Sequence, residues 1–187
     1  MSRSKWSWAI VVASSLSAFG CTTAVDDGVT DEETEPTASS TSEELTVSCT
    51  RHAETGYVSG SAKALTAVTV DGKLVEEHTA NAYIVMAQAA KKDGIYLKVV
   101  SGFRSMAEQK YLYGCYTHCS CNSCNLAAKP GYSNHQSGHA LDLNTSGSGV
   151  AHWLSLHAAH YGFKRTVPSE AWHYEWWGGG PGGGPCH

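Results

Sequence analysis

Residues 133–143 read SNHQSGHALDL and place two histidines, His135 and His139, four positions apart. On a helix, side chains at this spacing lie on one face and could hold a metal ion together. Gly138 interrupts the pair, however, and the serine and asparagine residues around His135 favour turns. We therefore expect His135 in a loop and do not expect a helix that carries both histidines.

The end of this stretch, HALDL, alternates in the manner of a strand over residues 139–143. Alternation directs Asp142 to one face of the strand and His139 to the other. Further along, residues 168–176 read PSEAWHYEW and add an acid and another histidine. Two histidines and one carboxylate form a complete protein ligand set for a catalytic zinc ion. A second, unligated carboxylate is the usual base for the attacking water.

Three separated motifs resemble one known family. SNHQSGHALD resembles the SxHxxGxAxD motif of the zinc D-alanyl-D-alanine peptidases, which include VanY-type carboxypeptidases and VanX-type dipeptidases. EAWH at residues 170–173 is similar to the ExxH motif of that family, and SGFRSMAEQKYLY at residues 101–113 is similar to its SGYRS-x-x-x-Q segment. The resemblance runs from about residue 70 to residue 177, and its motifs occur in the family's order.

The resemblance implies a role for each matching residue. It makes His135, Asp142 and His173 the ligands of one catalytic Zn²⁺ ion, and it makes Glu170 the general base. It implies that Arg104 polarises the scissile carbonyl, because a fixed guanidinium stabilises a developing oxyanion. Arg104 could alternatively be a structural ion-pair partner.

Three further residues are candidates for contact with substrate. Gln109 and Ser133 match family positions near the substrate, although either could instead cap a helix or stabilise a turn. Trp172 lies between the expected base and a ligand, so we expect it to shape the site, with a place in the core as the alternative.

The implied fold is the compact α+β domain shared with the Hedgehog signalling domain, in which a small, mostly antiparallel sheet is flanked by helices. The residue patterns favour the same class. They predict a hairpin over residues 68–75, helices over residues 76–92, 106–113 and 150–161, and strands over residues 95–102, 139–143, 163–167 and 172–177.

The first residues resemble a bacterial export signal. Residues 1–21 combine early basic residues with an apolar run and end in SAFGC, which resembles a lipobox. Lipid on Cys21 would anchor the protein to a membrane, with ordinary secretion as the alternative. Residues 22–45 hold eight acidic residues and no lysine or arginine, which is typical of a disordered tether. We expect the peptidase domain over residues 46–177 and a Gly/Pro-rich tail, flexible by composition, over residues 178–187.

Six cysteines remain if Cys21 carries lipid, and an even number in an exported chain favours disulfides. The sequence does not choose among the possible pairings, and a Cys49–Cys186 bond that staples the tail is a hypothesis. The other four cysteines lie in the segment CYTHCSCNSCN, residues 115–125, which we expect to be irregular and to form one wall of the cleft. A structural zinc site is the alternative for these four.

The function that the resemblance implies is a zinc D-alanyl-D-alanine carboxypeptidase acting on peptidoglycan stem peptides outside the cytoplasm. An L-alanyl-D-glutamate endopeptidase is an alternative, since RTVPSEAWHYEW also resembles related phage lysins. A non-catalytic zinc module that binds wall peptide is another. Net charge is −4, and residues 45–187 carry eleven basic and nine acidic residues, so nothing indicates nucleic acid. We expect a monomer.

Overall fold

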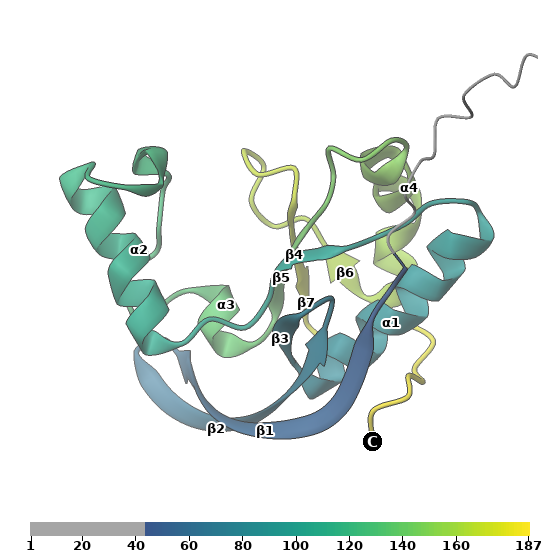
Figure 1. Ribbon diagram of the computed structural model, residues 1–187, viewed down its shortest axis with the longest axis horizontal. Helices are drawn as coiled ribbons and strands as arrows, with labels where there is room; N and C mark the ends of the chain where they lie inside the picture. The colour runs from purple at the N-terminus through teal and green to yellow at the C-terminus, as the bar shows by residue number, and fades with distance from the viewer. Residues whose placement is uncertain (1–43) are drawn as a thin grey trace, which may run out of the picture. The chain divides into compact units, whose positions relative to one another are not determined.

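The structure, a computed structural model, describes residues 44–187 and shows an α+β fold (Figure 1). Its strands form two antiparallel sheets, which confirms the predicted class but divides the expected single sheet in two. The three-stranded sheet has the order β1-β2-β3, with β1 at Val47–Val58, β2 at Ser61–Val70 and β3 at Lys73–Glu76. The four-stranded sheet has the order β4-β5-β7-β6, with β4 at Val99–Ser101, β5 at Ala140–Leu143, β7 at His173–Trp176 and β6 at Phe163–Lys164.

Two tight turns build the three-stranded sheet. Asp71 and Gly72 both have positive φ angles, 50° and 73°, as a two-residue hairpin turn requires, and the predicted hairpin is confirmed. Ser59 and Gly60 form a turn of the same kind between β1 and β2, with φ angles of 49° and 85°. Strand β1 was not predicted from the sequence, because most of its residues are exposed and it carries little apolar alternation.

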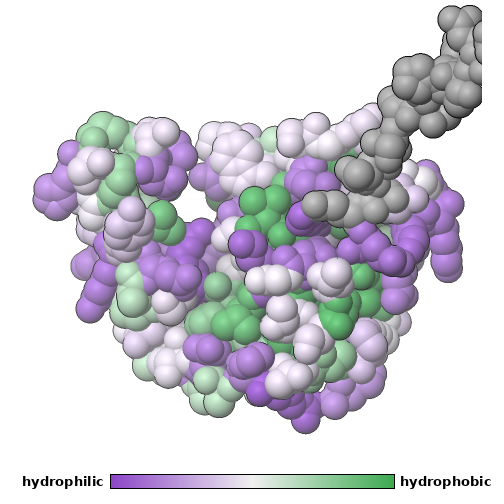
Figure 2. Space-filling view, in the orientation of Figure 1, coloured by the Kyte–Doolittle hydropathy of each residue, from purple (hydrophilic) through white to green (hydrophobic). Residues whose placement is uncertain are grey.

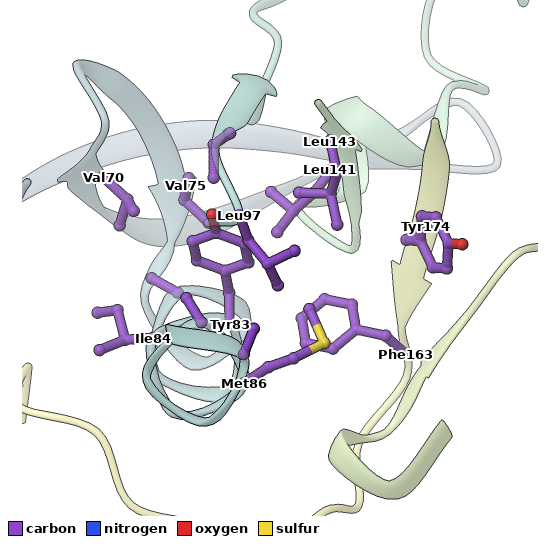
Figure 3. Packing of buried hydrophobic residues seen from close by; sticks show 14 of the residues in the cluster. Val70, Val75, Tyr83, Ile84, Met86, Leu97, Leu141, Leu143, Phe163 and Tyr174 are labelled. Atoms are coloured by element: carbon purple, nitrogen blue, oxygen red, sulfur yellow. The ribbon is translucent and has the colours of Figure 1, made fainter. Parts of the chain in front are cut away.

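The helices are α1 at Glu77–Lys92, α2 at Met106–His118, α3 at Asn134–Ser137 and α4 at Val150–His157, with 3₁₀ turns η1 at Asn122–Cys124 and η2 at Ala158–Tyr161. Helix α1 was predicted within one residue, and one face of it is buried, with the apolar residues Ala80, Tyr83, Ile84, Met86, Ala87 and Ala90. Tyr83 and Met86 of this helix point toward Leu97, Leu141 and Phe163 (Figure 3). The four-stranded sheet is therefore fixed against α1 by apolar packing.

The strand predicted over residues 95–102 is reduced to three residues. The side chain of Asn144 takes over part of the backbone pairing, because its Oδ1 accepts from the Lys98 N–H at 2.8 Å and its Nδ2 donates to the Tyr96 carbonyl at 3.0 Å. The following residues reach the other sheet, where the Phe103 N–H donates to the Leu74 carbonyl at 2.7 Å. The short β4 thus connects the core to the segment that carries Arg104.

Helix α2 begins as predicted with a capping box between Ser105 and Glu108. It continues five residues past the predicted end, to His118, so the expectation that the cysteine segment is irregular throughout is wrong. Disulfides Cys115–Cys121 and Cys119–Cys124 join the end of α2 to η1, and the left-handed Cys119 allows the chain to turn back. All four thiols are bonded, which leaves none for the alternative zinc site in this segment.

The hypothesis that Cys186 pairs with Cys49 is confirmed. Cys186 is buried, and its backbone pairs with the side chain of Asn81 on α1. The end of the tail is therefore packed against the core. Within residues 44–187, no helix has both the length and the apolar composition that crossing a membrane requires. The predicted export signal and Cys21 lie outside the described residues.

Candidate active site

Three predicted ligands meet at the edge between α3 and the four-stranded sheet. His135 lies on α3, Asp142 on β5 and His173 on β7, and one ligand atom from each lies within 4.8 Å of the others. Asp142 and His173 are paired directly across the antiparallel strands, so the sheet register sets their separation. Asp142 Oδ1 is 3.4 Å from His135 Nε2 and 3.2 Å from His173 Nδ1.

His135 lies in a single turn of helix, and its predicted placement in a loop is wrong. The Ser133 side chain caps this turn by accepting from the His135 N–H at 3.3 Å, and Gly138 ends it with a φ of +86°. A side chain at Gly138 would also collide with Glu76, so only glycine fits there. The imidazole Nδ1–H donates to the Gly102 carbonyl at 2.8 Å, which directs Nε2 toward Asp142.

His139 lies beyond this glycine and does not join the cluster. Its Nδ1 is 2.8 Å from the Trp176 carbonyl, and its ring stacks on Trp177 with 4.2 Å between the centroids. Helix α3 is too short to carry two histidines four residues apart, which is why the spacing alone misleads.

Asp142 is held ionised by its two neighbours. Burial tends to raise its pKa, but hydrogen bonds and charge interactions with His135 and His173 outweigh burial and hold the pKa of this carboxyl well below its usual range. The site therefore combines one negatively charged carboxylate with two imidazole nitrogens, His135 Nε2 and His173 Nδ1, which face it.

Glu175 is a functional candidate that the sequence analysis missed. It is 3% exposed, and its Oε1 is 3.0 Å from Nε2 of His173. Burial tends to raise its pKa, yet hydrogen bonds from Thr166, Asn134, His173 and Trp177 lower the pKa below its ordinary value. The alternation of the predicted strand at residues 172–177 places Glu175 on the same face as His173, but its partners Asn134 and Thr166 lie in other segments and could not be predicted from the strand.

Glu170 lies beside the cluster without belonging to it. Its Oε2 is 3.8 Å from His173 Nδ1, and its side chain is 26% exposed, so solvent and substrate can reach it. The Glu170 carbonyl accepts from the His173 N–H at 3.3 Å, which fixes the acid one turn before the ligand. A carboxylate placed in this way is suited to accept a proton from water at the cluster.

Arg104 is held by three contacts, and it interacts electrostatically with Asp142 and Glu170. Its N–H donates to the His135 carbonyl at 3.2 Å, its Nη1 donates to Gln109 Oε1 at 3.0 Å, and its Nη2 donates to Ser101 Oγ at 3.4 Å. Burial lowers the pKa of the guanidinium, while the carboxylates of Asp142, Glu108 and Glu170 oppose that shift. An arginine remains cationic in proteins, so this is a fixed positive charge.

The three predicted substrate residues lie at different depths. Gln109 is fully buried and holds Arg104, and its Nε2 donates to the Ala128 carbonyl at 2.7 Å. Ser133 is also buried and caps α3. Trp172, by contrast, is 46% exposed and directly precedes His173 in the chain. Of these three residues, Trp172 is therefore the one whose side chain a substrate can reach most easily.

A groove of about 560 Å³ adjoins Arg104. It is lined by the β2–β3 turn, the residues after β4 and the first turns of α2, where Lys73, Phe103 and Tyr111 contribute side chains. In the space-filling view, a notch separates the segment around α2 from the rest of the described chain (Figure 2). The lining of the groove includes Arg104 but not the three candidate ligands or Glu170, so the groove lies beside the cluster and does not enclose it.

The donor set fits a zinc ion. Two imidazole nitrogens and one carboxylate are the ligands of many catalytic zinc sites. Each histidine also directs its other ring nitrogen to an acceptor, the Gly102 carbonyl for His135 and the Glu175 carboxylate for His173, as metal-bound histidines do. His135, Asp142 and His173 would hold the ion, which would act as a Lewis acid and lower the pKa of water.

Comparison with known proteins agrees with this site. The sequence model of the VanY family, described as D-alanyl-D-alanine carboxypeptidase, matches residues 72–179, which is more than half of the chain. The chain therefore belongs to the VanY family. The match includes every residue of the three motifs identified above.

A curated D-alanyl-D-alanine carboxypeptidase of Enterococcus faecalis (strain ATCC 700802 / V583) is 31% identical over 116 residues, covering 48% of this chain and 43% of the relative. The chain spans less than half the length of the curated relatives it matches. The solved structure of VanYB in complex with D-alanine-D-alanine has a TM-score of 0.50 and 24% identity, and the alignment covers 68% of this chain and 78% of that one. This likeness confirms the predicted fold.

Proposed function

We propose that this protein is a zinc-dependent D,D-carboxypeptidase that removes the terminal D-alanine from peptidoglycan stem peptides. The observation that carries the proposal is the convergence of His135, Asp142 and His173 beside a carboxylate outside the ligand set, Glu170, within a chain of the VanY family. The E. faecalis relative of the same family is named for this activity.

The side chains divide the work of hydrolysis between them. Glu170 accepts a proton from the attacking water while the water oxygen bonds to the scissile carbonyl carbon. It then returns that proton to the amine of D-alanine as the C–N bond breaks. Arg104 donates to the carbonyl oxygen as negative charge develops there. Gln109 and Ser101 hold the guanidinium in place, so no reorganisation is needed during the reaction.

The test uses the full chain in detergent, loaded with zinc and incubated with a stem pentapeptide that ends in D-alanyl-D-alanine. Mass analysis of the products should show the loss of a single alanine, and the loss should disappear when zinc is chelated. A cut after the first L-alanine would instead support the endopeptidase alternative. Zinc binding without zinc-dependent cleavage would support the non-catalytic module.

We also propose that the domain acts outside the cytoplasm, tethered by lipid on Cys21. Three disulfides among the described residues support this location, because such bonds persist in oxidising compartments. The mature protein should partition with membranes and carry lipid at its N-terminus by mass spectrometry. A Cys21→Ala variant that remains lipidated and membrane-bound would contradict this proposal.

A further inference from the structure

The Glu175 carboxylate receives four hydrogen bonds, one from α3, one from the segment between β6 and β7, and two from residues in or directly after its own strand. Its Oε1 accepts from Thr166 Oγ1 at 2.6 Å and from Asn134 Nδ2 at 2.8 Å, and it lies 3.0 Å from His173 Nε2. Its Oε2 accepts from Trp177 Nε1 at 2.7 Å. A buried carboxylate costs several kcal/mol of desolvation unless its oxygens are hydrogen-bonded in this way.

This contact fixes which nitrogen of His173 faces the cluster. The Glu175 carboxylate lies 3.0 Å from Nε2 of His173 and can accept its hydrogen bond, which places the other ring nitrogen, Nδ1, on the side of the cluster, 3.2 Å from Asp142 Oδ1. His135 has the opposite arrangement, because its Nδ1–H donates to the backbone of Gly102 and its Nε2 faces Asp142. The orientation of His135 thus rests on main chain, whereas that of His173 rests on one side chain.

The other donors to Glu175 connect it to the remaining parts of the site. Asn134 precedes His135 on α3, so its hydrogen bond ties the helical turn of one ligand to the strand of the other. Thr166 belongs to the segment between β6 and β7, which also carries Glu170. Through these contacts Glu175 links two of the three ligand-bearing elements, α3 and β7, to the segment that carries Glu170.

We propose that Glu175 is a positioning residue that presents Nδ1 of His173 to the metal ion and locks α3 and the 165–172 segment against β7. This inference rests on the proposed zinc site. Glu175 does not touch the reacting atoms, and it acts through His173, Asn134 and Thr166. Partners of this kind typically contribute about 10- to 100-fold to metal affinity.

The test compares zinc binding by the full chain with and without Glu175→Gln. Glutamine keeps the volume but replaces one acceptor oxygen with an NH₂ group. Both oxygens of Glu175 accept hydrogen bonds, so in either orientation the NH₂ group would face a donor of a neighbouring residue. The zinc dissociation constant from chelator competition should rise about 10- to 100-fold. The absorption spectrum of the cobalt(II)-loaded protein should shift, because His173 is no longer held in its wild-type orientation.

Asp93→Asn is the matched control. Asp93 also accepts an indole N–H, that of Trp153 at 2.8 Å, but it lies at the end of α1 and contacts none of the ligands. A milder variant, Thr166→Val, removes one exposed donor to Glu175 and should weaken zinc binding in the same direction by a smaller factor. This variant decides the question if Glu175→Gln does not fold.

The inference is overturned if Glu175→Gln, or Thr166→Val where it must decide, binds zinc with the wild-type constant and gives the wild-type cobalt spectrum. Glu175 would then be only a packing residue. That result, obtained with a wild-type protein that binds zinc and cleaves stem peptide, leaves the proposed function intact. A wild-type protein that binds no zinc would reject both proposals together.

Discussion

The four-stranded sheet and the disulfide-bonded segment at residues 106–124, which we call the arm, are ordered by different means. The sheet pairs β5 with β7 so that Asp142 lies opposite His173, and its apolar side chains pack against α1. In α2, the main element of the arm, only Gln109 and Cys115 are buried, and two disulfides close its end. Hydrogen bonds and apolar packing organise the first region, and covalent bonds organise the second.

The difference separates the candidate metal site from the groove beside Arg104. The metal ligands are fixed by strand register and by a capped helical turn, neither of which involves the arm beyond α2's first turns. The groove beside Arg104 is lined in part by Tyr111 and Leu112 of the arm. We therefore expect changes in the arm to alter how peptide binds while zinc binding is preserved.

The largest effect is expected at the base. Glu170→Gln should lower kcat for stem-peptide cleavage by about 10²- to 10⁴-fold, because the amide cannot take the proton from water. Zinc affinity should be unchanged, since Glu170 is outside the ligand set. Steady-state kinetics and chelator competition measure the two quantities. Glu77→Gln, which removes an exposed pair with Arg51, is the control, and full activity of Glu170→Gln would reject the mechanism.

Arg104→Lys should have the next effect, a fall in kcat of about 10²- to 10³-fold with a smaller change in KM. Lysine keeps the charge but cannot contact both Gln109 and Ser101, so the positive group is no longer fixed over the carbonyl. Arg51→Lys on the exposed surface serves as the control. An equal rise in KM with unchanged kcat would show that Arg104 only binds substrate.

The tail disulfide should dominate stability. Replacing Cys49 and Cys186 together by serine opens a bond that spans 137 residues, and the free energy of unfolding should fall by about 5 kcal/mol. Denaturant titration measures this loss. Because the bond is remote from the ligands, zinc affinity of the folded variant should match the wild type. A loss below that of the arm variant described next would contradict this prediction.

The arm disulfides should matter least for folding. Cys115→Ser with Cys121→Ser opens a bond that spans only 6 residues, which predicts a loss of about 2 kcal/mol. KM for stem peptide should rise while the zinc dissociation constant stays at the wild-type value. If zinc affinity fell with the arm opened, the two regions would not be independent, and the comparison drawn above would be wrong.

The sequence predicted the elements that bury one regular face. Helix α1 and the 68–75 hairpin were found because apolar spacing and turn residues agree there. Strand β1 was not found, because its exposed residues leave no such pattern, although the Ser59-Gly60 pair marked its turn. The length of α2 was also not predicted. Its last turn is joined to η1 by disulfides, and the sequence does not choose which cysteines pair.

The residues of the candidate site also fall into two groups, those predicted from the sequence and those found only in the structure. The ligand set and base came from spacing and motif resemblance, and the structure brings those residues together. The contact of Gln109 with Arg104 and the network around Glu175 depend on side chains that meet only after the sheet and α3 have packed. Spacing in the sequence therefore predicts candidate ligands and bases more readily than the residues, such as Gln109 and Glu175, that position them.

The most direct test of the central claim is the zinc content of the chain and of two histidine variants. Wild type and His139→Ala should each bind one zinc ion, because His139 is engaged with Trp176 and Trp177 away from the cluster. His135→Ala should lose the ion under the same conditions. Retention of zinc by His135→Ala together with its loss from His139→Ala would contradict the site described here.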